Sequence, residues 1–462
     1  MDQELLDKVI KAYDIRGLVD EEISADFTFA LGIAFAKFIE REREPATIVV
    51  GEDMRPSSPD LATAFSDGIT SQGLDVIRIG LCSTDQLYFA SGALNMPGAM
   101  FTASHNPAQY NGIKLCRSGA KPIGQESGLA WIKSAIAQGF PIPNRPMGKE
   151  RSQDLLADYV KFLFSLFPEK SFAPDFQSRP LRIAIDAGNG MGGHTAPAVM
   201  REINAIVDGI YFELDGSFPN HEANPIEPKN LVDLQNLVRE KGSDIGLAFD
   251  GDADRCFLVD EKGNLVSPSA LTALIAKREL IKNPGASIIY NLICSKAVPE
   301  VITESGGRPL RSRVGHSYIK QMMADEGAVF GGEHSGHFYF KDFWSADSGM
   351  LAALHAIAAL LESQIPLSEL MQSFNRYSLS GEINTTVIDQ GKAIDKIKSH
   401  FKDYEPGLTF DELDGLTVKA KNWWFNLRSS NTEPLLRLNV EADTQEQMAS
   451  MRDLVLQLIR NG

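Results

Sequence analysis

Short apolar runs followed by small or polar turns recur along the chain, and each leads into a stretch with helical spacing of apolar residues. Three such runs with their turns are Thr47–Val50 before Gly51-Glu52-Asp53, Leu181–Ile185 before Asp186-Ala187-Gly188-Asn189-Gly190, and Ser287–Leu292 before Ile293-Cys294-Ser295-Lys296. Strands that alternate with helices predict α/β units with parallel or mixed sheets. These three apolar runs begin more than 100 residues apart, which suggests three related α/β units.

The last part of the chain has a different pattern, with a predicted strand over Leu435–Val440 and a predicted helix over Thr444–Ile459. A chain of 462 residues is too long for one core, since a domain takes roughly 150 residues. Breaker-rich segments divide it at Pro141–Pro146, at Asp260–Pro268 and around residues 374–382. We therefore expect an α/β protein of four domains, three related α/β units with mixed sheets and a C-terminal α+β domain. Their expected limits are residues 1–149, 150–264, 265–376 and 377–462.

Charge and cysteine content narrow the possible partners and the compartment. A net charge of −16 argues against nucleic acid or a membrane as the main partner, because both need an extended basic face. The four cysteines form no CxxC pair, which favours a reducing, cytoplasmic location over a disulfide scaffold. The segment Met1–Lys11 lacks the apolar core of a signal peptide. The longest apolar stretch, Met350–Leu361, is too short to span a bilayer and predicts a buried helix.

The segment Thr102-Ala103-Ser104-His105-Asn106-Pro107 predicts a tight polar turn after a small apolar run. Such a turn could expose the Ser104 hydroxyl for chemistry, but these six residues taken alone favour an ordinary turn without chemistry. Lys114 follows ten residues later and could bring a positive charge back to the same place.

Three carboxylates at alternate positions, Asp250, Asp252 and Asp254, follow a strand-like run. Carboxylates spaced in this way on a loop can converge on one hard cation. An EF-hand is rejected, because Arg255 stands where the loop needs glycine and the next residues look like a strand. We therefore favour Mg²⁺, with a phosphate oxygen completing its ligands.

Two more polar segments could bind a ligand. In Gly332–His337, the side chains of Glu333, Ser335 and His337 could bond sugar hydroxyls. A zinc site through His334 and His337 is the alternative, although no third soft ligand is evident. In Arg428–Pro434, an arginine, hydroxyls and an amide suit a phosphate, although an ordinary polar turn would look the same.

A glycine-rich turn gives a competing interpretation. Gly188–Gly193 satisfies the spacing G-x-G-x-x-G after a predicted strand, and Glu213 follows at the distance of a ribose-binding acid. This pattern favours the runner-up function, a nicotinamide-dependent oxidoreductase.

Taken together and in this order, these segments resemble the α-D-phosphohexomutase superfamily, and especially its phosphomannomutase/phosphoglucomutase subgroup, over essentially the whole chain. The resemblance implies that the four domains surround a central cleft and that the glycine-rich turn is scaffold. It implies that Ser104 is a phosphoserine and that Asp250, Asp252 and Asp254 hold Mg²⁺ beside it, with Ser104 completing the ligand set. Arg16 and Lys114 match positions near the reacting hydroxyl, and His316 matches a histidine that contacts the ligand. Together with His105 they are the candidates for the proton-transfer network, with the general base left open. The implied substrate-binding groups are Arg255, Glu333, Ser335, His337, Arg428, Ser430, Asn431 and Thr432.

The resemblance also implies a reaction. The phosphoserine would pass its phosphoryl group to a hexose 1-phosphate, and the hexose 1,6-bisphosphate would turn over and return its other phosphate to the serine. Mannose 1-phosphate and mannose 6-phosphate are the expected substrates, with glucose phosphates as further ones, and phosphoglucomutase as the main activity stays open. The expected partner is a small phosphosugar, with hexose 1,6-bisphosphate as activator, and the chain is expected to be a monomer or a weak dimer.

Two positions depart from the subgroup that the chain resembles. Ile293 stands where better-known bacterial members have a ligand-contacting lysine, which Lys296 could replace. His334 stands where many relatives carry methionine. These two positions leave the preferred sugar open, although His337 favours the mannose/glucose group.

Overall fold

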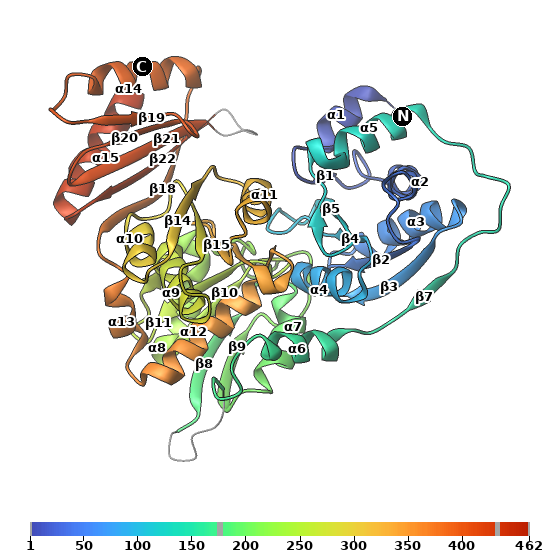
Figure 1. The fold of residues 1–462 in the computed structure, drawn as a ribbon, viewed down its shortest axis with the longest axis horizontal. Coiled ribbons are helices and arrows are strands. Elements are labelled where there is room, and N and C mark those ends of the chain that lie inside the picture. The colour runs from blue at the N-terminus through green and yellow to red at the C-terminus, as the bar shows by residue number, and fades with distance from the viewer. Residues whose placement is uncertain (1, 173–178, 430–434, 461–462) are drawn as a thin grey trace.

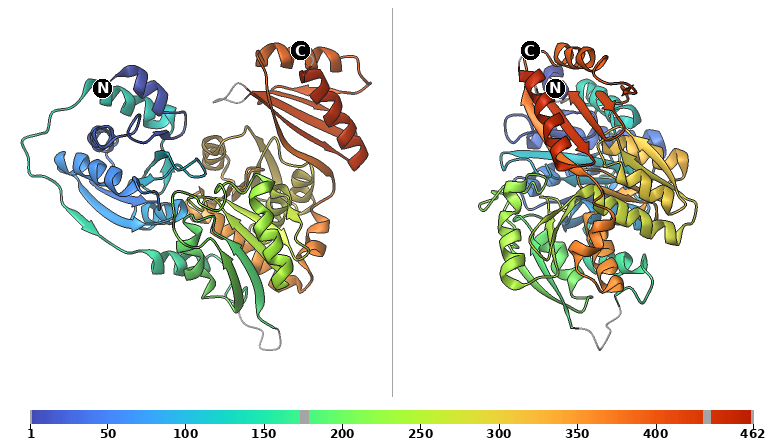
Figure 2. Two further views of the ribbon diagram at one scale, coloured as in Figure 1. Left: turned by 180° about the vertical axis from the view of Figure 1, so that it is seen from behind. Right: turned by 90° about the vertical axis from the view of Figure 1, so that its left-hand side faces the viewer.

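The computed structural model describes residues 2–172, 179–429 and 435–460. It contains four β-sheets, each with its own helices, and we call each sheet with its helices a unit (Figures 1 and 2). Three units have mixed sheets flanked by helices, and the fourth has an antiparallel sheet. The expected fold class of three α/β units and a C-terminal α+β unit is therefore confirmed.

The first unit has a seven-stranded sheet in the order β1-β5-β4-β2-β3-β7, with β6 beside β5. Its strands are β1 Ile15–Leu18, β2 Thr47–Glu52, β3 Asp75–Leu81, β4 Gly98–Phe101, β5 Tyr110–Arg117, β6 Lys121–Pro122 and β7 Glu150–Ser152. Its helices are α1 Gln3–Val9, α2 Ala25–Glu42, α3 Ser58–Ser71, α4 Thr84–Leu94, the π-helix η1 Gln125–Leu129 and α5 Ala130–Gln138. Helices α2 and α3 approach closely because Gly32 faces Gly68, and a side chain at Gly32 would lie 2.1 Å from the Phe65 carbonyl oxygen.

The second unit has the strand order β12-β11-β10-β8-β9. Its strands are β8 Leu181–Asp186, β9 Ala205–Ile210, β10 Ile245–Phe249, β11 Cys256–Asp260 and β12 Leu265–Val266. Its helices are α6 Leu156–Ser165, α7 Gly192–Met200, η2 Pro228–Leu231 and α8 Val232–Lys241. Strand β10 pairs in parallel with β8 but antiparallel with β11. The acidic segment is therefore the turn of the β10–β11 hairpin, where its alternate side chains can face one point.

The third unit has the strand order β14-β13-β15-β16-β17. Its strands are β13 Ser287–Asn291, β14 Arg308–Ser312, β15 Phe330–Gly332, β16 Phe338–Phe340 and β17 Ala346–Asp347. Its helices are α9 Pro268–Lys282, α10 Ala297–Glu304, α11 His316–Glu326, η3 Lys341–Phe343, α12 Gly349–Ser363, α13 Leu367–Leu370 and η4 Met371–Ser373. The predicted buried helix is confirmed in α12, which is buried from Gly349 to Leu360. Among the described helices none is by itself long and apolar enough to cross a membrane, and one bent pair, Gly349–Ser363 with Leu367–Ser373, passes by length and composition alone.

The fourth unit has the antiparallel order β18-β22-β21-β20-β19. Its elements are β18 Ser378–Thr386, α14 Gln390–Phe401, β19 Thr409–Asp411, β20 Leu416–Lys419, β21 Trp423–Ser429, β22 Leu435–Ala442 and α15 Gln445–Arg460. The predicted C-terminal strand and helix are confirmed as β22 and α15.

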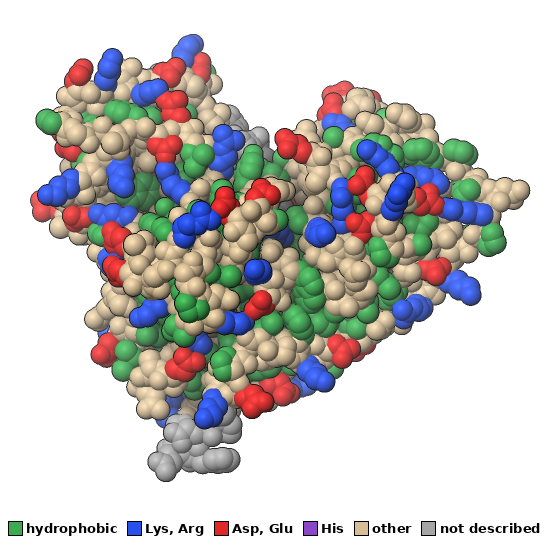
Figure 3. All heavy atoms as spheres, in the orientation of Figure 1, with side chains coloured by type: hydrophobic (Ala, Val, Ile, Leu, Met, Phe, Trp, Pro, Cys, Tyr) green, Lys and Arg blue, Asp and Glu red, His purple; other side chains and the backbone are tan. Residues whose placement is uncertain are grey.

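The hydrophobic cores join three units and leave the fourth apart. One cluster of buried side chains runs through the first three units, and the fourth unit has a separate cluster. Polar contacts connect the fourth unit to the third, among them Lys296 Nζ to Asp443 at 2.7 Å and the Val314 amide to Asp414 at 3.1 Å. The surface is hollowed between the fourth unit, at the upper left, and the first unit, at the right (Figure 3). The expected arrangement of four domains around a central cleft agrees with this shape.

Candidate active site

The loop that carries Ser104 follows β4 at the carboxyl end of the first sheet. Ser104 has a φ of 50°, a left-handed conformation that is uncommon for a residue other than glycine. Strain of this kind concentrates at functional sites. The loop turns through a hydrogen bond from the Asn106 amide to the Ala103 carbonyl, 3.0 Å long. The Ser104 hydroxyl donates to Asp250 Oδ2 at 2.8 Å, across the boundary between the first and second units.

Arg55 binds the backbone of the serine loop, and its side chain is fully buried. Its Nη1 donates to the carbonyls of Pro107 and Tyr110, both at 2.9 Å. Its Nη2 donates to the carbonyls of Ser104 at 3.0 Å and Asn106 at 2.7 Å. These bonds fix the backbone on both sides of the serine hydroxyl.

The acidic turn lies directly against the serine loop. Asp250 and Asp252 have no exposed surface, and Asp254 is 1% exposed. One carboxylate oxygen from each of the three can lie within 4.8 Å of the others. A side chain at Gly251 would come within 2.3 Å of the Ser104 carbonyl oxygen, so glycine is needed where the two loops meet.

Two cations compensate the three carboxylates. Lys114 Nζ, on β5, donates to Asp252 Oδ2 and Asp254 Oδ2, both at 2.6 Å. The Arg255 backbone amide donates to Asp250 Oδ1 at 3.1 Å, and its Nε donates to Asp250 Oδ2 at 2.9 Å. Three carboxylates against two cations leave an excess of negative charge that suits a further cation.

The burial of these groups separates their pKa values. Burial raises the pKa of Asp250 to about 7, an effect that the charge of Arg255 opposes and the other two aspartates strengthen. Burial would also raise the pKa of Asp252, but Lys114, together with Thr84 and Arg255, outweighs burial and lowers that pKa below its usual value. Burial opposes the charged form of Lys114, yet Asp252 and Asp254 raise the Lys114 pKa well above its usual value.

The carboxylate oxygens that the hydrogen bonds to Lys114 and Arg255 leave unused indicate whether the acidic turn could bind a metal ion. Oδ1 of Asp252 and Oδ1 of Asp254 are buried and have no hydrogen-bond partner among the described residues. Buried carboxylate oxygens without a partner are costly unless a cation binds them. Hard oxygen donors of this kind suit Mg²⁺ or Ca²⁺.

His105 and Arg16 lie beside the serine. The Nδ1 atom of His105 is 3.3 Å from Ser104 Oγ. Burial, with the nearby charges of Arg255 and Arg16, lowers the pKa of His105 well below its usual value, so the imidazole is neutral. Arg16, on β1, donates to Asn106 Oδ1 and to Asp14 Oδ2, both at 2.5 Å.

The third unit brings the segment Gly332–His337 to the acidic turn. His337 Nε2 is 3.6 Å from Asp254 Oδ1, and Ser335 Oγ is 3.0 Å from His337 Nδ1. Glu333 is 2% exposed and accepts from the Gly315 amide at 3.1 Å and from the Tyr339 hydroxyl at 2.7 Å. Ser335 and His337 are thus next to the acidic turn, and Glu333 is already held by the protein.

Helix α11 begins at His316, directly after Gly315, whose amide contacts Glu333. The backbone therefore places His316 near the Glu333 segment. Its side chain is not among the groups that the structure describes.

Arg428, on β21, belongs to the fourth unit. Its Nη2 donates to Glu382 Oε2 at 2.7 Å, and Arg437 Nη1 donates to the other oxygen of Glu382 at 3.2 Å. No ion pair or hydrogen bond within the described chain joins Arg428 to the serine loop or the acidic turn. Ser430, Asn431 and Thr432 lie outside the described residues.

His334 lies in the third unit, close enough to the fourth for the charge of Arg428 to affect its ring. Its Nδ1 atom is 3.1 Å from Ser269 Oγ. Burial lowers the pKa of His334, and the charges of Glu382 and Arg428 act on the ring from the fourth unit. The zinc alternative loses support, because among the described residues the side-chain groups that could hold a metal ion include His337, with Asp254 and Asp347, but not His334.

Lys296 does not point its ammonium freely into the site. Its Nζ atom bonds Asp443 at 2.7 Å and lies 3.8 Å from the centre of the Tyr377 ring. Ile293 is 3% exposed. Lys296 therefore contacts the fourth unit in this structure. The expectation that it could replace the ligand-contacting lysine, which relatives have where Ile293 stands, gains no support.

The glycine-rich turn serves packing. A side chain at Gly190 would lie 2.6 Å from the Gly251 carbonyl oxygen, and one at Gly193 would lie 2.2 Å from the Phe212 carbonyl oxygen. The Met191 amide donates to the Gly251 carbonyl at 2.9 Å. The turn therefore supports the acidic turn, and the space that a dinucleotide would need is filled by backbone.

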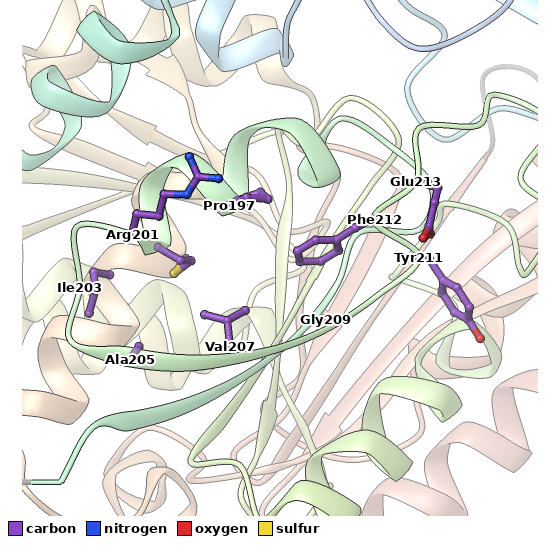
Figure 4. A pocket seen from close by; sticks show the side chains of 10 residues that line it. Pro197, Arg201, Ile203, Ala205, Val207, Gly209, Tyr211, Phe212 and Glu213 are labelled. Atoms are coloured by element: carbon purple, nitrogen blue, oxygen red, sulfur yellow. The ribbon is translucent and has the colours of Figure 1, made fainter.

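Another hollow, of about 550 Å³, lies between α7 and the edge strand β9. Figure 4 shows Arg201 and Glu213 at opposite ends of it, with apolar side chains such as Val207 between them. No polar groups converge there, in contrast to the serine loop and acidic turn.

Two groups at the site gave no clear signal in the sequence. Arg55 follows β2 in a polar turn, where an arginine ordinarily lies on the surface. The one available clue to its role at the site is its place just after the carboxyl end of a central parallel strand, where ligands commonly bind. Thr84, at the start of α4, donates its hydroxyl to Asp252 Oδ2 at 2.6 Å. Nothing in the local sequence distinguishes Thr84 from an ordinary first residue of a helix.

Family models described as "Phosphoglucomutase/phosphomannomutase" match the chain in four parts. They are the alpha/beta/alpha domain I over residues 7–140, domain II over 157–263, domain III over 267–377 and the C-terminal domain over 382–458. A protein of Escherichia coli (strain K12) named phosphomannomutase is 39% identical over 443 residues, 94% of each chain. A phosphomannomutase of Vibrio cholerae is 37% identical over 459 residues, 97% of each chain.

Two solved structures resemble the chain, one of them a member of the same family. The phosphoglucomutase/phosphomannomutase family protein of Burkholderia thailandensis superposes with a TM-score of 0.86 at 30% identity, over 100% of this chain and 99% of that one. The N-acetylphosphoglucosamine mutase of Aspergillus fumigatus, solved with GlcNAc-6P and magnesium, superposes with a TM-score of 0.60 at 12% identity, over 99% of this chain and 98% of that one. The second likeness is evidence for the fold alone.

Proposed function

The chain belongs to the phosphoglucomutase/phosphomannomutase family, and from that premise we propose that it interconverts mannose 1-phosphate and mannose 6-phosphate through a phosphorylated Ser104. Family membership makes the chain an intramolecular phosphotransferase, an isomerase of carbohydrate metabolism. The nicotinamide-dependent alternative is thereby overturned. One observation carries the proposal: Ser104 Oγ lies 2.8 Å from Asp250, inside a buried group of three carboxylates and two cations.

Ser104 gives and takes the phosphoryl group in this proposal. The phosphoserine transfers its group to the free hydroxyl of a hexose 1-phosphate, the hexose 1,6-bisphosphate turns over in the cleft, and its other phosphate returns to Ser104. Such transfer depends mainly on alignment and on compensation of charge. Lys114, partly buried, and Arg255, buried, lie beside the serine and supply positive charge for the phosphoryl oxygens.

Asp250, Asp252 and Asp254, with an oxygen on Ser104, are the proposed ligands of Mg²⁺. The Oδ1 atoms of Asp252 and Asp254 have no hydrogen-bond partner among the described residues, which supports this assignment. When bound, Mg²⁺ would neutralise phosphate charge and act as a Lewis acid on a phosphoryl oxygen.

Proton transfer must accompany each phosphoryl transfer. Neutral His105, with Nδ1 at 3.3 Å from Ser104 Oγ, can hold a proton at the serine. Lys114 and His316 complete the candidates, and Arg16 orients the loop through Asn106, since a guanidinium stays charged and is a poor base.

Substrate recognition is assigned to the third and fourth units. We assign the sugar hydroxyls to Glu333, Ser335 and His337, and the distal phosphate to Arg428. Ser430, Asn431 and Thr432 follow Arg428 in the chain, and we propose that they join the same phosphate site.

Glucose phosphates are the second candidate substrates, with phosphoglucomutase as the main activity. The family description names both activities, and mannose differs from glucose at one hydroxyl. Comparing kcat/KM on mannose 1-phosphate and glucose 1-phosphate, with a hexose 1,6-bisphosphate activator present, decides between them.

The cellular setting follows from charge and thiols. We propose a cytoplasmic enzyme, a monomer or weak dimer, that acts on small phosphosugars and has neither nucleic acid nor a membrane as partner. A net charge of −16 disfavours polyanionic partners, and all four cysteines are free and buried. The domain limits 1–149, 150–264, 265–376 and 377–462 are kept as part of this proposal.

Intact-protein mass spectrometry tests the phosphoserine. Purified protein should carry the mass of one phosphoryl group in part of the molecules, and Ser104→Ala should lose both that mass and nearly all turnover. Ser134→Ala, which changes an exposed serine on α5, is the matched control and should keep both. Full turnover in Ser104→Ala would overturn the proposal.

A further inference from the structure

Asp252 uses its two carboxylate oxygens differently. Oδ2 accepts two hydrogen bonds, from Thr84 Oγ1 and from Lys114 Nζ, each 2.6 Å long. Oδ1 is buried and has no hydrogen-bond partner among the described residues. With Oδ2 occupied by two donors, Oδ1 is the oxygen that remains available for a cation.

Thr84 reaches Asp252 from another unit. It is the first residue of α4 in the first unit, whereas Asp252 lies in the turn between β10 and β11 of the second unit. Its backbone amide also donates to the Asp252 carbonyl, at 3.0 Å. Two bonds from one residue therefore fix both the backbone and the carboxylate of Asp252.

The start of α4 is itself anchored from three units. The neighbouring Asp85 is 1% exposed and accepts hydrogen bonds from Ser83, from the Tyr159 hydroxyl at 2.7 Å and from Ser348 Oγ at 2.6 Å. Ser83 belongs to the first unit, Tyr159 to α6 of the second, and Ser348 caps α12 of the third. Because the start of α4 is held in this way, Thr84 has little freedom to move with Asp252 if the carboxylate of Asp252 shifts.

We propose that Thr84 is a positioning residue for the metal site: its hydroxyl fixes the carboxylate of Asp252 so that Oδ1 faces the cation. This inference rests on the proposed metal ligands Asp250, Asp252 and Asp254. Groups that orient a metal ligand typically contribute about 10-fold to 100-fold in metal affinity. Lys114 holds the same oxygen, but the rigid, uncharged hydroxyl of Thr84 sets the orientation without adding charge to the site.

Binding of Mn²⁺, followed by the EPR signal of the free ion, tests the inference without reference to turnover. Thr84→Val keeps the shape of the side chain and removes the hydroxyl, Thr84→Ser restores it, and Thr84→Ala removes it without placing a methyl group against the carboxylate. Thr28→Val is the matched control, because Thr28 is also buried in a helix of the first unit but bonds only carbonyls of its own helix end. The phosphorylation level of every sample is matched by intact mass.

We expect Thr84→Val and Thr84→Ala to bind Mn²⁺ about 10-fold to 100-fold more weakly than the unaltered protein. Thr84→Ser and Thr28→Val should remain within about threefold, a limit set well below that effect. If Thr84→Val does not fold, the comparison of Thr84→Ala with Thr84→Ser decides. Unchanged affinity in both variants that lack the hydroxyl overturns the role of Thr84, whereas absence of Mn²⁺ binding by the unaltered protein overturns the metal ligands themselves.

Discussion

Replacing Arg55 by lysine should damage the serine loop more than its conservative chemistry suggests. All five N–H groups of the guanidinium are used: Nε donates to Asp53 at 3.2 Å, and the four others donate to loop carbonyls at 2.7–3.0 Å. A lysine ammonium has three donors and no planar fork. At least two of the five acceptors must therefore lose their partner.

The expected cost follows from these lost bonds. An unpaired buried acceptor costs about 1–3 kcal/mol, so two of them cost about 2–6 kcal/mol of folding free energy. Loss of the bond to the Ser104 carbonyl also lets the hydroxyl move, and a displacement of about 1 Å can reduce turnover roughly 100-fold. We expect Arg55→Lys to show both a lower unfolding midpoint and a lower kcat/KM.

The assay compares kcat/KM on mannose 1-phosphate, the phosphorylated fraction by intact mass and the urea midpoint. Arg78→Lys is the control, since Arg78 is a partly buried arginine of the first unit that bonds Glu52 and Thr63 instead of the serine loop. Wild-type kcat/KM and phosphorylation in Arg55→Lys would refute the reasoning, whatever happened to the midpoint.

Two further changes test the phosphate site of the fourth unit and the buried carboxyl of Asp85, which joins the first three units. Arg428→Ala should raise KM about 10-fold to 100-fold for both hexose 1-phosphates, because a hydrogen bond to a charged group contributes about 1.5–3 kcal/mol; Arg437→Ala is the control, and an unchanged KM in Arg428→Ala would move the phosphate site elsewhere. Burial raises the pKa of Asp85 from 3.8 to about 6, against the hydrogen bonds of Ser348, Ser83 and Tyr159. The raised pKa contributes stability that is full below pH 3.8 and lost as pH rises through about 6. Between pH 4 and pH 7, the unaltered protein should therefore lose about 2 kcal/mol of unfolding free energy relative to Asp85→Asn, which does not titrate at this position; a pH-independent difference in urea titrations would contradict this.

The sequence by itself determined the fold class, and it predicted several segments that the structure brings together at the candidate site. The apolar runs predicted β2, β8 and β13, because periodicity reports which residues each element buries. Alternate aspartates on a short turn predicted a cation site, since a hairpin turn brings Asp250, Asp252 and Asp254 together locally. The phosphate role of the polar segment after Arg428 stays a prediction, because residues 430–434 lie outside the described residues.

Other features depended on contacts between distant elements. Ser104 and Asp250 are 146 residues apart, and only the packing of the first unit on the second brings them within 2.8 Å. The sequence could not show that His105 is neutral, because its pKa depends on burial by residues from other parts of the chain. It also could not separate Lys296, which the fourth unit engages, from a ligand-binding lysine.

Arg55 and Thr84 show the limit most clearly. In the sequence, Arg55 lies in a polar turn and Thr84 at the first position of a helix, where a solvated side chain is the ordinary outcome. In the structure, Arg55 holds four carbonyls of the serine loop, and Thr84 holds an aspartate of another unit. Local pattern determines which segments form strands, helices and turns, whereas the partners of a buried polar group are set by the packing of units, because that packing removes the group from water and requires it to find a bond.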